Sequence, residues 1–186
     1  MDVLVLYASK HGHTEKVAAR VAAAAEAAGA VAHLRCVAGS PEEVAPGDYD
    51  LVIVGASIHA GRHQREIVDW AVAHHTALAL VPSALFTVCL TAAEETDEAR
   101  ATTRRYLDEF VEATGWTPWK TVTLAGALQY REYGFATRLL IRRLMRRAGR
   151  PTDAAHDYDY TDWDAVERFA RECVGMAVEP AGLSRG

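Results

Sequence analysis

The first segment with the residue types of a binding site follows a short apolar run near the amino terminus. The run extends from Val3 to Tyr7, and an alanine-rich stretch begins after Thr14. Hydroxyl groups, a glycine and the free N–H groups of a helix amino terminus can together bind a phosphate. The residues that could do so here are Ser9, Lys10, His11, Gly12, His13 and Thr14. The alternative is an ordinary turn in which Thr14 caps the helix.

The spacing of this segment limits which phosphate compound it could bind. It contains one glycine, Gly12, and no Gly-Lys-Ser or Gly-Lys-Thr sequence. The patterns G-x-x-x-x-G-K-[ST] and G-x-G-x-x-G are therefore both absent from it. These absences disfavour a nucleoside triphosphate or a dinucleotide, and they favour a compound with a single terminal phosphate.

Two later segments have the composition of loops that close over a ligand. GASIHAGRH covers residues 55–63, and TAAEETDE covers residues 91–98. Each follows an apolar run that predicts a buried strand. In an open parallel sheet, ligands bind beyond the carboxyl ends of the strands. One loop could then hold a phosphate while the other two flank a flat ring, which predicts flavin mononucleotide (FMN) as the ligand.

The second segment contains two histidines, His59 and His63, that are the candidates for catalysis. Histidine titrates near neutral pH and can therefore protonate or polarise a bound ring. The alternative is that both are solvated loop residues. Their spacing of four would suit a metal only on a helix, and Gly61 lies between them, so we predict no metal site.

Strand-like apolar runs alternate with helical stretches along most of the chain. We predict strands at residues 3–7, 31–37, 51–55, 85–90 and 121–125, and helices between them at residues 14–28, 64–75 and 97–114. This alternation predicts an α/β fold with a doubly wound, five-stranded parallel sheet in the order 2-1-3-4-5. Apolar spacing places Ile67, Val68, Ala71 and Val72 on the buried face of the second helix. Residues 1–177 form a single domain in this interpretation, and residues 178–186 form a disordered tail.

Two further helices are predicted after the fifth strand. The second begins at Thr161 as its N-cap, with Asp164 in its first turn, and ends near Val174. The first covers residues 134–148, and its basic side chains include Arg138, Arg142, Arg143 and Arg146. A basic amphipathic helix can lie on an anionic membrane surface or bind anionic groups of a substrate. The alternative is an ordinary surface helix that packs on the sheet.

Composition and charge restrict the class of protein. The net charge of −5 argues against nucleic acid as a partner, because phosphate backbones need a basic surface. The three cysteines are widely separated, which excludes a disulfide framework and predicts the reducing cytoplasm as the location. The longest apolar stretch, which starts at Ala77, is interrupted by Pro82 and Ser83, so we predict a buried strand rather than a membrane span.

Several quoted segments resemble a known family. YASKHGHTEKVA resembles the [ST]-x-x-G-x-T phosphate loop of flavodoxin-like FMN proteins. More specific similarity comes from GASIHAGRH, PSALFTVCLTA, AGALQYREYGFATRLLIRRLMRRAGRPTD and YTDWDAVERFAR. In order and spacing these are similar to the flavodoxin-type, menaquinone-dependent protoporphyrinogen oxidase family of bacterial haem synthesis. The similarity extends from Val3 to about Val174, and an extra helix after strand five distinguishes that family from plain flavodoxins.

The resemblance implies a cofactor, a reaction and a set of binding residues. FMN would bind with its phosphate on residues 9–14. Its ring would be flanked by Ser57, Ile58, His59, Ala60, Gly61, Leu90, Thr91, Ala92 and Ala93. The protein would oxidise protoporphyrinogen IX and pass electrons to menaquinone or another quinone. Tyr130 and Tyr133, just after strand five, would lie near the substrate; the alternative is that they are ordinary half-buried aromatic residues. Three residues depart from the family pattern: His11 replaces an acidic residue, Ala60 an aromatic one and Cys89 an asparagine.

The resemblance also bears on location and on competing functions. It implies a cytoplasmic protein that contacts the inner face of the cell membrane, and it is compatible with a homo-oligomer. The alternatives are a flavodoxin-like electron carrier, a general FMN-dependent quinone reductase, and an interaction module that has lost its flavin. The basic helix and the two tyrosines favour the oxidase, since a carrier needs neither.

Overall fold

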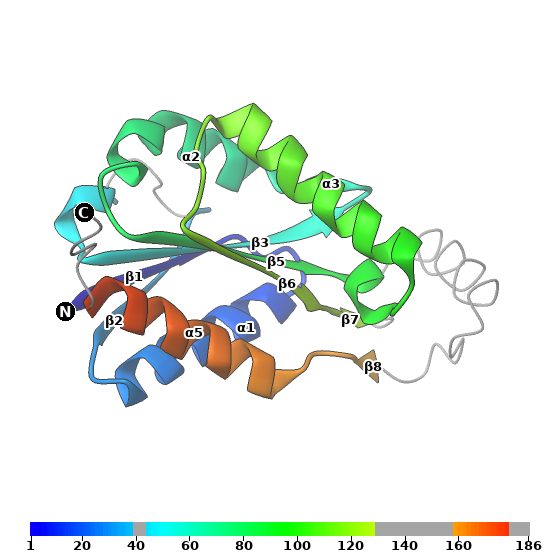
Figure 1. Cartoon of the computed structure of the whole chain (residues 1–186), viewed down its shortest axis with the longest axis horizontal. Coiled ribbons are helices and arrows are strands. Elements are labelled where there is room, and N and C mark those ends of the chain that lie inside the picture. The colour runs from blue at the N-terminus through cyan, green and yellow to red at the C-terminus, as the bar shows by residue number, and fades with distance from the viewer. Residues whose placement is uncertain (39–43, 129–157, 179–186) are drawn as a thin grey trace, which may run out of the picture.

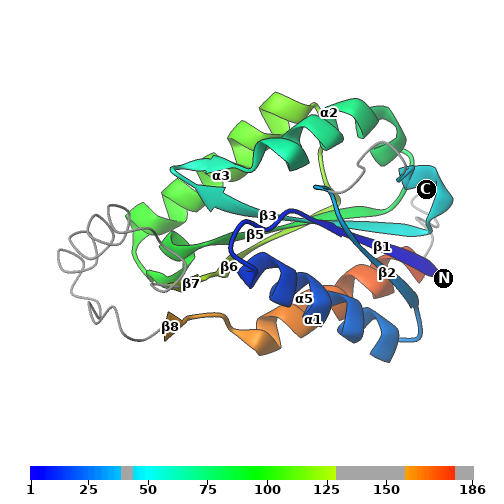
Figure 2. The same cartoon turned by 180° about the vertical axis from the view of Figure 1, so that it is seen from behind.

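The structure is a computed structural model in which residues 1–38, 44–128 and 158–178 are described. It has a central parallel sheet between two layers of helices (Figure 1). Helices α1 (His13–Ala27) and α5 (Trp163–Val178) pack together on one face, whereas α2 (Arg65–Leu78) and α3 (Asp97–Thr114) pack together on the other. The view from behind shows the same three layers (Figure 2). The predicted fold class is confirmed.

The five parallel strands lie in the order β2-β1-β3-β5-β6. They are β1 (Asp2–Tyr7), β2 (Val31–Cys36), β3 (Leu51–His59), β5 (Ser83–Cys89) and β6 (Lys120–Ala125). Among the parallel strands this is the predicted order 2-1-3-4-5, but the sheet has six strands rather than the predicted five, because the short strand β4 (Arg62–His63) pairs antiparallel with β3. Val5 of β1 pairs with Leu34 of β2 on one side and with Ile53 of β3 on the other. The direction of winding therefore reverses around β1, and ligands of such sheets bind at this point.

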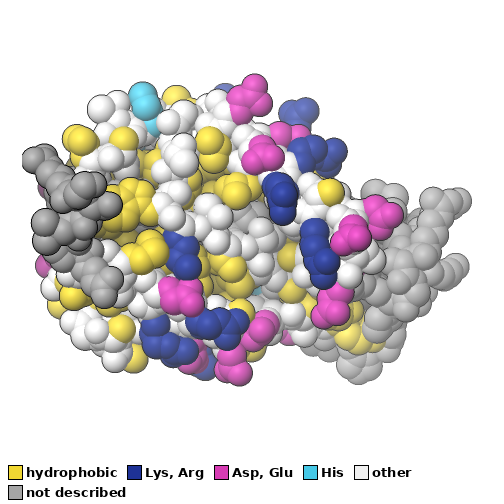
Figure 3. Space-filling model, viewed as in Figure 1, with side chains coloured by type: hydrophobic (Ala, Val, Ile, Leu, Met, Phe, Trp, Pro, Cys, Tyr) yellow, Lys and Arg dark blue, Asp and Glu magenta, His cyan; other side chains and the backbone are white. Residues whose placement is uncertain are grey.

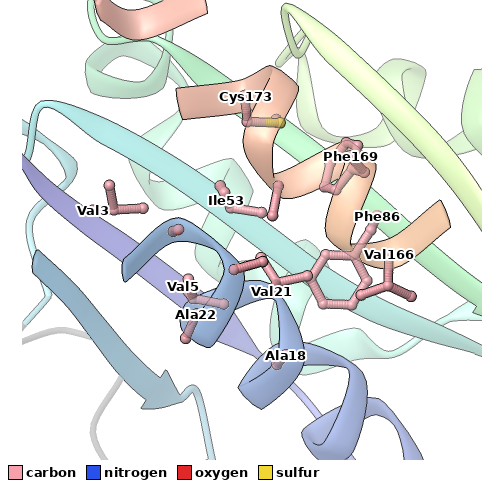
Figure 4. Packing of buried hydrophobic residues seen from close by; sticks show 14 of the residues in the cluster. Val3, Val5, Ala18, Val21, Ala22, Ile53, Phe86, Val166, Phe169 and Cys173 are labelled. Atoms are coloured by element: carbon pink, nitrogen blue, oxygen red, sulfur yellow. The ribbon is translucent and has the colours of Figure 1, made fainter. Parts of the chain in front are cut away.

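Alternate residues of each strand contribute to separate cores on the two faces of the sheet. The core against α1 and α5 is shown in Figure 4, where Val5, Ile53 and Phe86 of the strands meet side chains of both helices. The α1 side of this contact includes small residues such as Ala18 and Ala22 beside Val21, and the small residues allow the helix to lie close to the strands. Burial on both faces explains why these strands are nearly continuous apolar runs in the sequence.

Gly55 occupies a point in β3 where the sheet has no room for a side chain. A β-carbon on Gly55 would lie 2.0 Å from Cζ of Phe86. Phe86 is completely buried, and its ring meets that of Phe169 edge to face at 6.4 Å. Because the Phe86 ring is held from both sides, it cannot move away, and a glycine is required at this position.

We therefore expect the substitution Gly55→Ala to lower the free energy of unfolding by about 3 kcal/mol, as overpacking of a filled core does. Urea denaturation measures this. The matched control is Gly175→Ala in α5, where a β-carbon would have no neighbour within 4 Å. The control should be neutral or raise the free energy of unfolding by about 1 kcal/mol, because alanine favours a helix. Equal stability of Gly55→Ala and the parent would contradict the packing argument.

The starts of two helices differ from the prediction. Gly12, rather than Thr14, is the N-cap of α1, and Thr14 is buried in the first turn. In α5 the N-cap is Asp162, whose Oδ1 accepts the N–H of Ala165 at 3.0 Å. The predicted cap, Thr161, instead donates its hydroxyl to the carbonyl of Ala125 at 2.9 Å. In both places the side chain that the local sequence predicted as the cap makes a tertiary contact instead: Thr14 is buried, and Thr161 binds a distant carbonyl.

The second predicted helix and the loop before it also differ. α2 continues to Leu78, and Trp70 lies on its buried face, whereas Val72 is 45% exposed and was wrongly placed inward. Residues 56–63 were predicted as a loop, but β3 continues to His59 and pairs antiparallel with β4 (Arg62–His63).

A short antiparallel pair that was not predicted joins the two sides of the segment 129–157. Leu128 of β7 (Ala127–Leu128) pairs with Tyr158 of β8 (Tyr158–Asp159). Strands of two residues have no periodicity from which they could be predicted. The predicted helix at residues 134–148 lies outside the described residues, as do Tyr130, Tyr133, Arg138, Arg142, Arg143 and Arg146. Residues 179–186 also lie outside them, and Val178, predicted to begin the tail, ends α5.

Candidate functional site

The segment after β1 forms a turn that leads directly into α1. The N–H of Gly12 donates to Oγ of Ser9 at 2.9 Å, and Gly12 has a left-handed φ of 79°. The first hydrogen bond of the helix runs from the N–H of Lys16 to the carbonyl of Gly12 at 3.2 Å. Helix geometry leaves the N–H groups of His13 and Thr14 without acceptors in the helix. A β-carbon on Gly12 would have no neighbour within 4 Å, so the turn is uncrowded on this side, and the N–H groups at the start of the helix could bind a phosphate.

The side chain of His13 connects this turn to the far end of the chain. Thr161 donates its only hydroxyl hydrogen to the carbonyl of Ala125, so the imidazole must donate from Nε2 to Oγ1 of Thr161 at 2.8 Å. Burial lowers the pKa of His13, and nearby Asp159 opposes this shift. The imidazole of His13 therefore binds Thr161, and its backbone N–H is the group that could contribute to a phosphate site.

The second segment is a tight hairpin between β3 and β4. His59 pairs with Arg62, so Ala60 and Gly61 form a two-residue turn. Their φ angles are 49° and 79°, as in type I′ turns, which match the twist of antiparallel strands. Ala60 is the one non-glycine residue with a positive φ within the described ranges. Because β1 and β3 are neighbouring parallel strands, this turn and the first segment lie at the same edge of the sheet.

His59 connects the hairpin to the first segment and to the start of α2. Its ring lies edge to face with that of His11, with 5.7 Å between the ring centroids. Its Nε2 lies 3.0 Å from Oγ of Ser57, which is 2.9 Å from Oε1 of Gln64. Burial lowers the pKa of His59, and the neighbouring His11 and Lys10 lower it further. His59 is therefore a neutral, half-buried imidazole between two of the predicted cofactor loops.

His63, the other candidate for catalysis, has a different environment. Its Nε2 forms a hydrogen bond of 3.1 Å with Oγ1 of Thr87 in β5, and its ring packs on Phe110 of α3 with centroids 4.8 Å apart. Burial lowers its pKa to about 4. At neutral pH it is uncharged, and its contacts attach β4 to the sheet and to α3. This geometry favours a role in holding the hairpin over one in proton transfer.

The pKa of His63 makes stability depend on pH in a predictable way. Its folded-state pKa of about 4 lies below the unfolded value of 6.5, so the unfolded chain binds more protons between these values. Stability should then decrease as pH falls from 6.5 to 4, with about 3 kcal/mol from this residue. Unfolding free energies of the parent and of His63→Gln over this range measure the effect. The difference between the two proteins should shrink as pH falls, and a constant difference would contradict the assignment.

The third segment follows β5 as a short helical turn, η3 (Leu90–Ala93). The carbonyl of Thr91 accepts the N–H of Glu94 at 3.0 Å, and residues 90–93 are half-buried. Cys89 lies beneath this turn, and burial raises the pKa of its thiol. The carbonyl of Cys89 accepts the N–H of Gly126, which ties the turn to the end of β6. Cys89 is therefore a protonated thiol that supports the third loop.

The structure brings the three predicted loops to one edge of the sheet, because they follow the neighbouring strands β1, β3 and β5. Gln64, Thr87 and Thr161 were not predicted as site residues, although each holds a predicted histidine or serine. Their partners lie far away in the sequence, so spacing carried no signal for Thr87 and Thr161. Gln64 was detectable as the polar residue that directly follows the segment GASIHAGRH.

Over residues 1–38, 44–128 and 158–178, no group of three or more His, Cys, Asp or Glu side chains is arranged to hold a metal ion. Within the same ranges, no helix has the length and apolar character needed to cross a membrane.

A doubly wound sheet with these loops after β1, β3 and β5 defines a flavodoxin-like protein. Solved structures agree at the level of the fold. Flavodoxin 1 from Bacillus cereus, in its oxidised form, has a TM-score of 0.54 at 16% identity, covering 94% of this chain and 98% of its own. A flavodoxin, WrbA-like protein from Agrobacterium tumefaciens has a TM-score of 0.55 at 16% identity, covering 95% and 97%.

Sequence comparison places the chain in a family. Residues 4–155 match the family described as "Flavodoxin domain", so the chain belongs to the flavodoxin family. It is similar to the protein named "Protoporphyrinogen IX dehydrogenase [quinone]" of Escherichia coli (strain K12), with 31% identity over 97% of this chain and 98% of that protein. A protein of the same name from Leishmania major is 39% identical over 72% of this chain, and the match spans 58% of that protein.

Proposed function

We propose that this chain is an FMN-dependent dehydrogenase that oxidises protoporphyrinogen IX and passes the electrons to a quinone. The observation that carries the proposal is the end-to-end similarity to the Escherichia coli protein of that name. The three loops at one edge of the sheet support the assignment of FMN as the cofactor. The first of them is a turn at a helix amino terminus, which suits a phosphate. Neither an electron carrier nor a general quinone reductase is favoured by a specific feature of the described residues.

The proposal gives each loop a role. The N–H groups at the start of α1, with Ser9 and Lys10 nearby, would bind the FMN phosphate. The β3–β4 hairpin and residues 90–93 would flank the flavin ring, and Ala60 would contribute a backbone contact in place of an aromatic ring. Bound FMN would supply the acceptor for two electrons and a hydrogen from the substrate. His59 is the side chain best placed for proton exchange, because its neutral ring lies between two of these loops.

The position of the residues that flank the segment 129–157 supports the proposal that the substrate is a porphyrinogen. The described residues that flank it are paired in β7 and β8, and the contact from His13 to Thr161 lies between this pair and the turn before α1. The flanking residues therefore lie near the proposed cofactor site. The segment itself contains the predicted residues Tyr130, Tyr133, Arg138 and Arg142. Arginine forks bind carboxylates in pairs of hydrogen bonds, which suits the propionates of a porphyrinogen.

The function is tested with the purified full-length chain. We expect a yellow protein that quenches the fluorescence of added FMN, and a large acceleration of porphyrin fluorescence when protoporphyrinogen IX and a quinone are supplied together. Gly12→Ala should weaken FMN binding by about tenfold, because a β-carbon strains the left-handed turn. Gly175→Ala, away from the site, is the control. A protein that binds FMN but does not exceed the spontaneous rate would be a general FMN-dependent reductase, and a chain that binds no FMN would be the interaction module.

We also propose that the basic sequence at residues 138–147 places the enzyme on the inner face of the cell membrane, where quinone dissolves. On the face in Figure 3, positive and negative side chains of the described residues are mixed. Arg105 and Glu109 of α3 and Lys120 and Glu172 of β6 and α5 form ion pairs of this kind. By contrast, Arg138, Arg142, Arg143, Arg146 and Arg147 follow one another with no acidic residue between them. Clustered arginines bind anionic lipid surfaces.

Vesicle binding tests this location. The parent should co-sediment with vesicles that contain anionic phosphatidylserine and much less with neutral ones, because each basic residue near the surface contributes about 1 kcal/mol. Replacing Arg138, Arg142, Arg143 and Arg146 by glutamine should abolish the difference. A control with Arg100, Arg104, Arg105 and Arg171 replaced removes the same charge from α3 and α5. Equal loss of binding in both proteins would show a general charge effect and contradict a membrane site in the segment.

A further inference from the structure

The hydrogen bonds around His59 form a chain whose direction can be worked out. The backbone N–H of Ser57 points to Oε1 of Gln64 at 3.3 Å. A backbone N–H only donates, so the amide atom that faces it must be the oxygen and not the NH₂ group. This contact therefore fixes which way the Gln64 amide is turned.

The same oxygen determines what the Ser57 hydroxyl does. Oγ of Ser57 lies 2.9 Å from Oε1 of Gln64, and an amide oxygen only accepts. The hydroxyl therefore donates its single hydrogen to Gln64. Its remaining contact, 3.0 Å from Nε2 of His59, can only be one in which it accepts. Nε2 must then carry the hydrogen, and in the neutral ring Nδ1 has the free electron pair.

We propose that Gln64 is a positioning residue that acts through Ser57 to hold His59 in the Nε2–H form, so that Nδ1 is the atom that takes a proton from the substrate. The inference rests on the proposed function, because it needs a flavin beside the hairpin. Oxidation of the porphyrinogen removes one hydride, which goes to bound FMN, and one proton. An N–H bond of the substrate breaks as the Nδ1–H bond forms, and water later removes this proton from the imidazolium.

The surroundings of His59 agree with a proton acceptor. The groups that face it are His11 and Lys10 from the first loop and Glu66 from α2. Burial lowers the pKa of His59, the two basic groups lower it further, and Glu66 opposes them. The ring is therefore neutral near pH 7 and can accept a proton. Gln64 itself is held in place because it follows His63, whose ring is bound to Thr87.

Alternative explanations of the contact make different predictions. If Gln64 only caps α2, the form of the His59 ring would not depend on its side chain. The structure already argues against this role, because the Gln64 side chain makes no capping hydrogen bond to α2. If it only fills space, leucine would replace it without effect. The proposal instead requires that loss of the amide oxygen release the Ser57 hydroxyl, which could then donate to Nε2 and allow the hydrogen to move to Nδ1.

The test uses the full-length chain loaded with FMN, the substitution Gln64→Leu, and ¹⁵N NMR of the histidine rings. In the parent we expect the Nε2–H form of His59 alone. In Gln64→Leu we expect a mixture of both forms and a kcat about five- to tenfold lower with little change in KM, the size expected for one neutral hydrogen bond. His63 serves as the internal control, since its partner Thr87 is unchanged.

Two further substitutions separate positioning from general damage. Gln64→Glu keeps an acceptor for Ser57, so the Nε2–H form should be retained, and the added negative charge should raise the pKa of His59 and move the acidic limb of the kcat profile to higher pH. Arg65→Gln changes the exposed neighbour of Gln64 and should alter neither readout. If Gln64→Leu does not fold, Ser57→Ala breaks the same chain and should give the same loss.

The outcomes distinguish failure of the proposed function from failure of the role proposed for Gln64. A parent chain that binds no FMN or does not oxidise the porphyrinogen would overturn the proposed function. A parent that does both, together with a Gln64→Leu protein that keeps the Nε2–H form and the parental kcat, would overturn only the role of Gln64. A shifted pH profile in Gln64→Glu with an unchanged ring form would confirm that the residue acts through His59.

Discussion

The site depends on the parallel pairing of β1, β3 and β5. Because these strands lie side by side and run in the same direction, the segments that follow them emerge at one edge of the sheet. The pairing continues to the first loop, where the N–H of Ala8 donates to the carbonyl of Gly55 at 3.1 Å. The Phe86 ring in turn leaves no room for a β-carbon at Gly55. The packing of Phe86 against Gly55 and the position of the loop after β1 therefore depend on the same strand pairing.

Beyond the strand ends, part-buried hydrogen bonds between side chains determine how each loop is held. His13 binds Thr161, His63 binds Thr87, and Ser57 binds Gln64. A buried polar group without a partner costs more than its hydrogen bond contributes, so each loop is restricted to the geometry that satisfies its groups. Histidines that are alike in sequence thereby acquire different roles. His13 connects the turn before α1 to α5, His63 holds the hairpin, and His59 retains an unprotonated ring nitrogen at neutral pH.

The errors of prediction occurred where tertiary contacts replaced local preferences. α3 was predicted at residues 97–114 and found there, because Thr96 accepts the N–H of Ala99 as a cap and Gly115 ends the helix in a left-handed conformation. Thr14 and Thr161 were assigned as caps on the same grounds, but one is buried and the other binds a distant carbonyl. The hairpin at residues 56–63 was missed because Ala60 carries no turn signal, although its φ is positive.

Apolar periodicity and the position of glycines were sufficient to predict the class of fold and the three loops that form the proposed site, because the pattern of apolar residues and the turn residues can be read from the sequence locally. The order of the parallel strands was predicted from the orders that doubly wound sheets commonly have. The tertiary structure alone decided which side chains in those loops are free to act, because that depends on partners such as Thr87 and Thr161, which are distant in the chain. It also decided the protonated nitrogen of His59, since a hydrogen-bond chain acquires a direction only when all of its members are in contact.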